Sequence, residues 1–254
     1  MILDSFRLDG KVALVSGSTR GLGQGAAIAL AEAGADVALL DRGDASETAD
    51  RIRALGRGVH PIRRDLASAT PEELRDAVAE AVAELGGLDI LVNNAGTIRR
   101  APAADYSAGD WDDVLTVNLD AVFHLSQAAG RHMIAQGSGR IINVASMLSF
   151  QGGILVPAYT ASKHAVAGLT KALANEWAAS GVTVNAVAPG YMATDNTAAL
   201  RADEEREASI VSRIPAGRWG TPADLQGVFV FLASDAAAYV TGAIVPVDGG
   251  WLVR

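Results

Sequence analysis

The sequence predicts an α/β protein, with one doubly wound sheet of seven mainly parallel strands and helices on both faces. Short runs rich in Val, Ile and Leu alternate with Ala-rich segments of helical period along most of the 254 residues. Most of these runs are apolar at consecutive positions, which is typical of parallel strands covered on both sides. Half of the residues are hydrophobic, enough for one large core. We therefore expect a single domain over residues 1–254.

The expected strands are short, and all but the last precede a segment of helical character. They cover residues 11–17, 36–41, 58–65, 88–96, 140–146, 182–190 and 243–250. The expected helices cover residues 22–35, 46–56, 70–87, 157–180 and 221–234, with two more inside 107–135. Thr70 and Thr221 stand where two of these helices begin, each followed by proline, and this pattern is typical of helix starts.

One segment interrupts the alternation late in the chain. Residues 195–217 are polar and charged, and they fit neither a buried strand nor an amphipathic helix of ordinary length. A solvated surface insertion is one interpretation. The other is a lid over an active site, since functional loops are often placed in this way.

Composition excludes several classes of function. The chain has no cysteine, which rules out disulfides and thiolate chemistry, and its net charge of −8 argues against a nucleic-acid surface. No apolar run is long enough to cross a membrane, and the N-terminus does not look like a signal peptide, so we expect a cytoplasmic protein. No metal site is expected, because no metal-ligand spacing relates the four histidines, His60, His124, His132 and His164.

The first strand leads into a glycine-rich loop, GSTRGLG, at residues 17–23. Glycines let the backbone turn sharply and approach a pyrophosphate, whose charge the amides at the start of the next helix can bind. The spacing differs from the common G-x-G-x-x-G, and a glycine-rich turn without a ligand is the alternative. The strand-to-helix position favours a dinucleotide, with candidate contacts at Gly17, Ser18, Arg20, Gly21, Leu22 and Gly23.

An acidic residue ends the second strand, where the adenosine ribose of a dinucleotide is expected. Asp41 can accept hydrogen bonds from both ribose hydroxyls and repel a 2′-phosphate, which favours NAD over NADP. Arg20 and Arg42 could each attract that phosphate, but we expect Asp41 to dominate at short range. Asp65, followed by Leu66, ends the third expected strand and can reach the adenine; its alternative role is to cap a helix.

Tyr159 and Lys163 lie four residues apart in an expected helix, so they share one face. A free phenol has a pKa of ~10, too high for proton transfer at neutral pH. An ammonium ~4 Å away, at an effective dielectric of ~20, contributes on the order of 4 kcal/mol, which lowers that pKa by about 3. The pair therefore predicts an acid and base for hydride chemistry at a carbonyl, although a surface tyrosine beside a snorkelling lysine is the alternative.

Two further polar residues are candidates for the same site. Ser146 ends the fifth expected strand, where strand ends line the ligand crevice, and can hold the carbonyl oxygen. Asn118 falls inside a helical segment, where asparagine is unfavourable. Its side chain, or a water on the backbone there, could connect Lys163 to solvent.

In combination, these motifs resemble those of the short-chain dehydrogenase/reductase family. The motifs are GSTRGLG (17–23), NNAG (93–96), Asn118, Ser146, YTASK (159–163) and PGYMAT (189–194). The resemblance covers essentially the whole chain and implies a Rossmann-type domain, a nicotinamide cofactor and a homotetramer, with Trp251 and the tail at a subunit contact. Ser16 stands where the family usually has threonine, but it keeps the hydroxyl.

The resemblance also implies roles for individual residues. Tyr159 is the acid and base, Ser146 orients the substrate oxygen, Lys163 lowers the tyrosine pKa and holds the nicotinamide ribose, and Asn118 holds a relay water. Further cofactor contacts are implied at Asn93, Ala95, Gly96, Pro189, Gly190, Met192 and Thr194.

A narrower resemblance, to the sugar-acid dehydrogenases of bacterial uronate and pectin breakdown, lies in AGTIRR (95–100), SMLSFQGG (146–153) and PGYMATDNT (189–197). Arg99 and Arg100 are candidates to bind the substrate carboxylate, unless they belong to an ordinary surface loop, and Gln151 can bond a sugar hydroxyl. Three other activities of the family stay open: gluconate 5-dehydrogenase, 2-deoxygluconate 3-dehydrogenase and 3-oxoacyl-carrier-protein reductase. A non-catalytic dinucleotide-sensing module is the alternative outside enzymes.

Overall fold

The seven expected strands form one parallel sheet in the computed structural model, which describes residues 1–254 except for the side chain of Asn196. The strand order is β3-β2-β1-β4-β5-β6-β7, and every pairing is parallel. The bounds are β1 Val12–Ser16, β2 Asp36–Asp41, β3 Val59–Arg63, β4 Ile90–Asn93, β5 Gly139–Val144, β6 Val182–Pro189 and β7 Ile244–Val247. The order reverses direction between β1 and β4, and a crevice for ligands is expected there.

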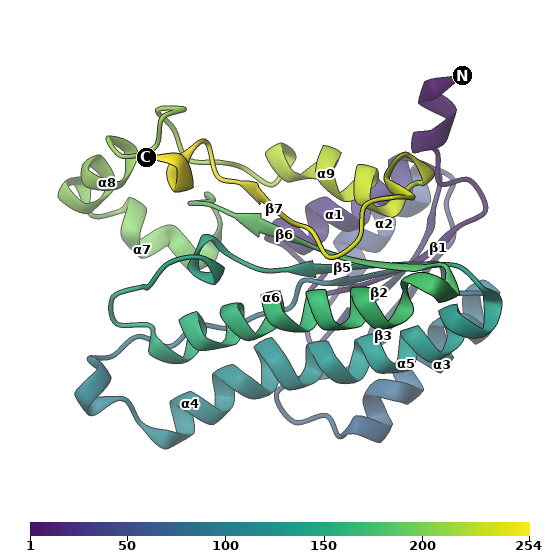
Figure 1. The fold of residues 1–254 in the computed structure, drawn as a ribbon, viewed down its shortest axis with the longest axis horizontal. Helices are drawn as coiled ribbons and strands as arrows, with labels where there is room; N and C mark the ends of the chain where they lie inside the picture. The colour runs from purple at the N-terminus through teal and green to yellow at the C-terminus, as the bar shows by residue number, and fades with distance from the viewer.

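Helices cover both faces of this sheet (Figure 1). On one face lie α1 Gly21–Glu32, α2 Ser46–Ala54 and α9 Ala223–Ala233; on the other lie α3 Pro71–Leu85, α5 Ala121–Gln136 and α6 Pro157–Trp177. Each face has its own buried cluster of aliphatic side chains, and β1 and β6 are buried at every position. The continuous apolar runs of the sequence are therefore explained by coverage from both sides.

The two helices expected inside 107–135 are α4 Ala108–Leu115 and α5, and a π-helical turn at Thr116–Asp120 joins them. The wider turn is marked by the Ala121 amide, which bonds back to the carbonyl of Thr116, five residues earlier. Asn118 is fully buried in the middle of this turn. A π-turn inside an α-helix commonly marks a functional site.

All of the expected strands except β2 end earlier than the sequence suggested. β3 ends at Arg63, β4 at Asn93 and β5 at Val144, so Asp65 and Ser146 each lie two residues beyond a strand. Both of these side chains instead shape the turn that follows, because Asp65 accepts from the Ala67 amide at 3.1 Å and Ser146 accepts from the Leu148 amide at 3.1 Å.

The segment 195–217 folds into two short helices, α7 Ala198–Arg201 and α8 Glu204–Val211, at the end of the molecule where the C-terminus also lies (Figure 1). Hydrogen bonds close its base, from the Gly220 amide to the Tyr191 carbonyl at 2.9 Å and from the Ala193 amide to the Gly220 carbonyl at 2.8 Å. Trp251, expected at a subunit contact, is instead buried within the chain against Tyr191. Its indole packs against Ile210 and Ile214 of the segment 195–217, which composition alone did not reveal.

The contact between α5 and α6 gives a stability prediction. A Cβ at Gly130 would lie 2.7 Å from the ring of Trp177, whereas a Cβ at Gly168 would have no neighbour within 4 Å. Gly130→Ala should therefore lower the free energy of unfolding by about 1–3 kcal/mol, despite its gain in helix propensity. Gly168→Ala, the control, should raise it by up to ~1 kcal/mol. Urea denaturation measures both; equal effects would contradict the close packing at Gly130.

Candidate active site

The glycine loop has the backbone geometry that close approach to a phosphate requires. Gly17 and Gly21 have φ of 67° and 59°, in the left-handed region that glycine adopts most readily. A Cβ at Gly23 would lie 2.1 Å from the Gly17 carbonyl oxygen, so a side chain has no room there. Ser18 is fully buried, and its hydroxyl has no hydrogen-bond partner among the described residues. This cradle fits the pyrophosphate of a dinucleotide.

The NNAG motif holds the glycine loop in place. Asn94 donates from its side-chain amide to the carbonyls of Ser16 and Gly17, both at 3.0 Å. The hydroxyl of Ser16 accepts from the Asn94 and Ala95 amides at 3.0 and 3.1 Å. Sequence reasoning missed Asn94 as a determinant of the site. Ser16 stands where the family usually has threonine, but its hydroxyl keeps these two hydrogen bonds.

The Asn93 side chain is turned away from the cleft. It is buried and donates to the Ser126 hydroxyl and to the Asn143 carbonyl oxygen, both at 2.9 Å. Asn143 in turn donates to the hydroxyl of Thr170 on α6 at 2.9 Å. Any contact of Asn93 with the adenosine must therefore come from its backbone, while its side chain belongs to a polar column beneath the sheet.

Asp41 stands at the end of β2, as the sequence predicted, but its carboxylate already has protein donors. One oxygen accepts from the amide and the hydroxyl of Thr19 at 3.1 and 3.0 Å, and the other accepts from the Gly43 amide at 3.0 Å. A carboxylate offers about four acceptor positions. Asp41 is thus held rigidly beside the glycine loop, with fewer acceptor positions left for ribose hydroxyls than sequence reasoning assumed.

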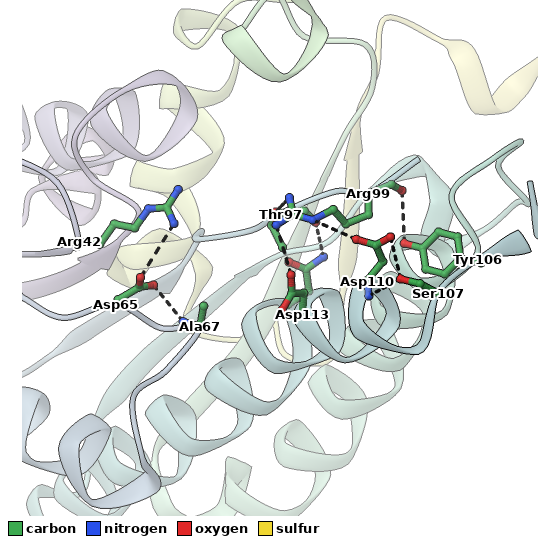
Figure 2. A network of polar contacts seen from close by, with 10 residues as sticks. Arg42, Asp65, Ala67, Thr97, Arg99, Tyr106, Ser107, Asp110 and Asp113 are labelled. Carbon is green, nitrogen blue, oxygen red and sulfur yellow. Dashed lines mark hydrogen bonds and ion pairs between the residues drawn. The ribbon is translucent and has the colours of Figure 1, made fainter. Parts of the chain in front are cut away.

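Arginines surround this end of the cleft. Asp41 and Arg63 line a cavity of about 370 Å³ between the ends of β2 and β3. An adjoining hollow is lined by Arg42, Arg63 and Arg64 together with Asp65, whose carboxylate lies 4.0 Å from the Arg42 guanidinium (Figure 2). The charge around a bound ribose is therefore mixed.

Arg20, the other cation that could attract a 2′-phosphate, extends towards the segment 195–217. Its guanidinium pairs with Asp195 at 2.8 Å, and both side chains are largely exposed. Thr194 lies over Gly21 of the glycine loop at about the same place, since a Cβ on that glycine would lie 3.8 Å from the threonine methyl. The segment after β6 and the glycine loop therefore face each other across the cleft, as expected for two sides of a dinucleotide site.

The structure brings Tyr159, Lys163 and Ser146 together. Lys163 is 4 % exposed, its ammonium lies 5.6 Å from the centre of the Tyr159 ring, and it donates to the Val144 carbonyl at 2.6 Å. Ser146 is buried at the end of β5 beside the phenol. The two side chains lie close together, as their spacing predicted, whereas the burial of the ammonium beneath the ring was not predicted.

The electrostatics differ from the simple sequence argument. Burial raises the pKa of Tyr159 above its ordinary value, while hydrogen bonding with Ser146 and the charge of Arg100 act in the opposite direction. Burial also lowers the pKa of Lys163 to about 8. An ammonium beside the ring favours the phenolate, but with the protein's own groups alone burial outweighs it, so the expected fall in the Tyr159 pKa is not reached.

Asn118 joins the turn after β4 to α6. Its side-chain oxygen accepts from the Thr97 amide at 2.8 Å, and its side-chain amide donates to the Thr97 carbonyl at 2.9 Å and the Ser162 hydroxyl at 3.2 Å. Ser162 donates to the carbonyl of Tyr159 at 2.8 Å. The side chain is fully engaged in these bonds, so a relay water would have to bind the backbone of the π-helical turn.

The two candidate arginines point to different places. The Arg99 guanidinium lies 3.5 Å from Asp110 and 3.3 Å from Asp113 on α4 (Figure 2). Arg100, in contrast, acts electrostatically on Tyr159. The charge of Arg100 therefore reaches the Tyr159 phenol, whereas the Arg99 guanidinium is paired with α4. Gln151 is half-buried in the loop after Ser146, near the start of α6.

Two other kinds of site were searched for across the described residues. No group of three or more His, Cys, Asp or Glu side chains there could hold a metal ion. No helix within those residues combines the length and apolar character needed to cross a bilayer.

Comparison with known proteins now adds to this geometry. A family model described as Enoyl-(Acyl carrier protein) reductase matches residues 17–252. The chain belongs to the short-chain dehydrogenase/reductase family. Its fold is accordingly Rossmann-like, and it is an oxidoreductase that uses a nicotinamide dinucleotide. Both the family and the fold predicted from the motifs are confirmed.

The chain is similar to the 2-dehydro-3-deoxy-D-gluconate 5-dehydrogenase of Escherichia coli strain K12, with 56% identity over 255 residues and the whole of both chains covered. This enzyme is the one that the narrower sequence resemblance indicated, and that resemblance is confirmed. The match includes the segments around the cleft as well as the dinucleotide motifs.

Solved structures give the same picture. A chain from Beutenbergia cavernae, with NADP bound at low occupancy, is 55% identical, with a TM-score of 0.94 and 98% and 100% of the two chains covered. A gluconate 5-dehydrogenase of Burkholderia cenocepacia in complex with NADP and tartrate is 42% identical, with a TM-score of 0.95 and both chains covered in full.

The buried Lys163 gives a prediction about stability and pH. Below pH 8 this lysine is charged both in the folded and in the unfolded chain, so the folded chain bears the full desolvation cost. The difference between the ordinary pKa of 10.5 and about 8 corresponds to roughly 3 kcal/mol. Lys163→Met removes this cost and also the bond to Val144. We expect the variant to be at least as stable as the wild type at pH 7.

The sign of the pH dependence follows from proton binding. Between about pH 8 and 10.5 the unfolded chain binds a proton that the folded chain has lost at Lys163, so wild-type stability rises with pH. The stability advantage of Lys163→Met should therefore shrink between pH 7 and pH 9.5, as measured by urea denaturation without added dinucleotide. A difference that is constant or grows with pH would contradict the lowered pKa.

Proposed function

We propose that this chain is an NAD-dependent dehydrogenase that interconverts 2,5-diketo-3-deoxygluconate and 2-keto-3-deoxygluconate in uronate and pectin breakdown. The observation that carries the proposal is the placement of Ser146, Tyr159 and buried Lys163 close together, where the charge of Arg100 also acts on the Tyr159 phenol. The identity to 2-dehydro-3-deoxy-D-gluconate 5-dehydrogenase over the whole chain supports the substrate.

The proposed catalytic residues are Asn118, Ser146, Tyr159 and Lys163. A bound nicotinamide dinucleotide supplies or accepts the hydride at the reacting carbon. Tyr159 donates its proton to the carbonyl oxygen in reduction and removes the hydroxyl proton in oxidation. Ser146 donates a hydrogen bond to the same oxygen, and the Lys163 charge stabilises the phenolate left on Tyr159. The backbone around Asn118 holds the water that returns the proton.

Arg100 is the proposed anchor of the substrate carboxylate. A guanidinium binds a carboxylate through two parallel hydrogen bonds, which fixes both position and direction. The acid end of the substrate would then lie on the β4 side of the cleft and its carbonyl near Ser146 and Tyr159. Gln151, in the loop after Ser146, is the proposed partner of a sugar hydroxyl.

The proposed preference for NAD rests on Asp41. Its carboxylate is fixed by Thr19 and Gly43 at the place where a 2′-phosphate would lie, and like charges repel. Use of NADP is the alternative, because Arg42 and Arg63 stand nearby and the structural relatives from Beutenbergia and Burkholderia contain NADP.

The proposal also covers the domain structure, the location and the oligomeric state of the protein. Residues 1–254 would act as one dinucleotide-binding domain in the cytoplasm, with 195–217 as the substrate lid. A homotetramer is proposed from the family pattern; Phe123 and Ile134 support it, as large apolar side chains that are exposed on α5 although their neighbours pack the core.

Gluconate 5-dehydrogenase activity is the second candidate, because the relative from Burkholderia carries that name. Both substrates are sugar acids with a reacting carbonyl or hydroxyl group, and they differ at the neighbouring carbons. Purified protein is assayed with 2-keto-3-deoxygluconate, gluconate, 2-deoxygluconate and a 3-oxoacyl thioester. The relative rates with these four substrates distinguish the candidate activities. No turnover of any keto sugar acid would overturn the proposal and favour a dinucleotide-sensing module.

Tyr159→Phe removes the proposed proton donor and keeps the ring. It should lower kcat by at least about 100-fold, as is usual when a general acid is lost. Tyr106→Phe is the matched control, since its hydroxyl contacts only the Arg99 carbonyl at 3.3 Å. Steady-state kinetics with 2-keto-3-deoxygluconate measure both. An equal loss in the two variants would refute the role of Tyr159.

Asp41→Ala removes the charge beside the ribose. The ratio of kcat/KM for NAD to kcat/KM for NADP should fall by about tenfold or more, because one repulsive charge and at least one hydrogen bond are lost. Asp44→Ala, in the same cavity wall, should leave the ratio within about twofold. If the wild type already prefers NADP strongly, the weight given to Asp41 over the arginines is wrong.

Arg100→Gln and Arg99→Gln form a matched pair. Loss of a charge-assisted bond to the carboxylate typically costs 10-fold or more, so Arg100→Gln should raise KM for the sugar acid by about that factor. Arg99→Gln breaks the exposed ion pairs with α4 and a 3.4 Å hydrogen bond to the Thr97 hydroxyl, and it should change KM by less than about threefold. The reverse order of effects would assign the carboxylate to Arg99.

A further inference from the structure

The last seven residues of the chain, 248–254, lie between the two ends of the lid segment, and we call them the C-terminal brace. Gly249 and Gly250 have φ of 64° and 91°. A Cβ on either would lie 2.9 Å from an atom of Ile214 or Pro215, at the far end of the lid segment. Both the backbone conformation and the space therefore require glycine at these two positions. The brace is packed against the lid by its own backbone.

Three further contacts join the brace to the end of α8. The Arg213 guanidinium lies 4.1 Å from the centre of the Trp251 ring, a cation–π distance. The Arg254 guanidinium donates to the Ser212 carbonyl at 2.8 Å, and the Ala216 amide donates to the Gly249 carbonyl at 2.9 Å. Figure 1 shows the C-terminus beside α8. The position of α8 is thus tied to the final residue of the chain.

The brace also contacts the other end of the lid segment, where β6 ends. A Cβ on Gly190 would lie 2.6 Å from the Cα of Asp248, and the rings of Tyr191 and Trp251 are 4.8 Å apart in an edge-on arrangement. Trp219 packs on Tyr191 from another side, with ring centres 5.3 Å apart. Trp251 is 5 % exposed and thus links the residues before Met192 to those that follow α8.

We propose that Arg213, Trp251 and Arg254 are positioning residues that hold α8 over the substrate cleft and so set the KM for the sugar acid. This inference rests on the proposed function of residues 195–217 as a substrate lid. The brace acts on the substrate side of the cleft. Among the described residues, no hydrogen bond or ion pair joins it to the glycine loop or to Asp41, which lie at the proposed adenosine end of the dinucleotide.

The experiment compares four variants of the full-length protein. Arg213→Gln removes the charge over Trp251, Arg213→Lys restores a cation there, and deletion of Arg254 removes the bond to Ser212. Arg206→Gln is the control: this arginine is exposed on α8, and its side chain has no hydrogen bond or ion pair among the described residues. Amide hydrogen exchange across Glu204–Val211, KM for 2-keto-3-deoxygluconate and Kd for NAD are measured for each.

Arg213→Gln and the deletion should speed exchange in α8 and raise KM by about threefold to tenfold, with Kd for NAD unchanged within about twofold. Arg213→Lys should recover part of both effects, and Arg206→Gln should show neither. If Arg213→Gln and Arg206→Gln show the same exchange rates in α8 and the same KM, the proposed role of the brace is wrong. If the wild type turns over no sugar acid, the proposed function fails, while exchange in α8 still decides whether the brace holds the lid.

Discussion

The site depends on burying one ammonium group. Lys163 is enclosed between α6 and the end of β5, where the Val144 carbonyl is its hydrogen-bond acceptor, and burial lowers its pKa to about 8. A buried charge lowers the stability of the folded chain unless an opposite charge or hydrogen bonds compensate for the lost solvent. Here the neighbouring Tyr159 is buried as well and has a raised pKa. A positive charge brought close to the phenol would favour the phenolate, while the same charge would disfavour a nearby ammonium.

The surrounding structure holds this pair rigidly. Asn118, in the π-helical turn, fixes the loop after β4 and reaches the Tyr159 carbonyl through Ser162. The Ser149 hydroxyl donates to the Lys163 carbonyl at 2.6 Å, which ties the loop after β5 to the same turn of α6. Because all strands of the parallel sheet run in the same direction, the glycine loop and Ser146 lie at the same edge of the sheet. The helix α6 thus carries both Tyr159 and Lys163, and these hydrogen bonds fix its position relative to the loops after β4 and β5.

The sequence predicted the sheet, most helix bounds and the Tyr159–Lys163 pair, because these depend on local period and spacing. It did not distinguish Arg99 from Arg100, since only tertiary contacts place Asp110 and Asp113 beside the first of them. It named Asn93 as a cofactor contact without separating its backbone from its side chain, and only tertiary packing shows that the side chain is bonded to Asn143. The rise in the Tyr159 pKa was also missed, because spacing reports a neighbouring charge but not the loss of solvent.

The most direct test of the account is the titration of the Tyr159 phenol, followed by NMR of tyrosine labelled with ¹³C at Cζ. The account predicts that Tyr159 ionises only above its ordinary pKa in the protein alone. With NAD⁺ bound, whose nicotinamide ring carries a positive charge, the pKa of Tyr159 should fall, and it should stay higher in Lys163→Met than in the wild type. An equal pKa for Tyr159 in the wild type and in Lys163→Met, with NAD⁺ bound to both, would contradict the role of the buried ammonium.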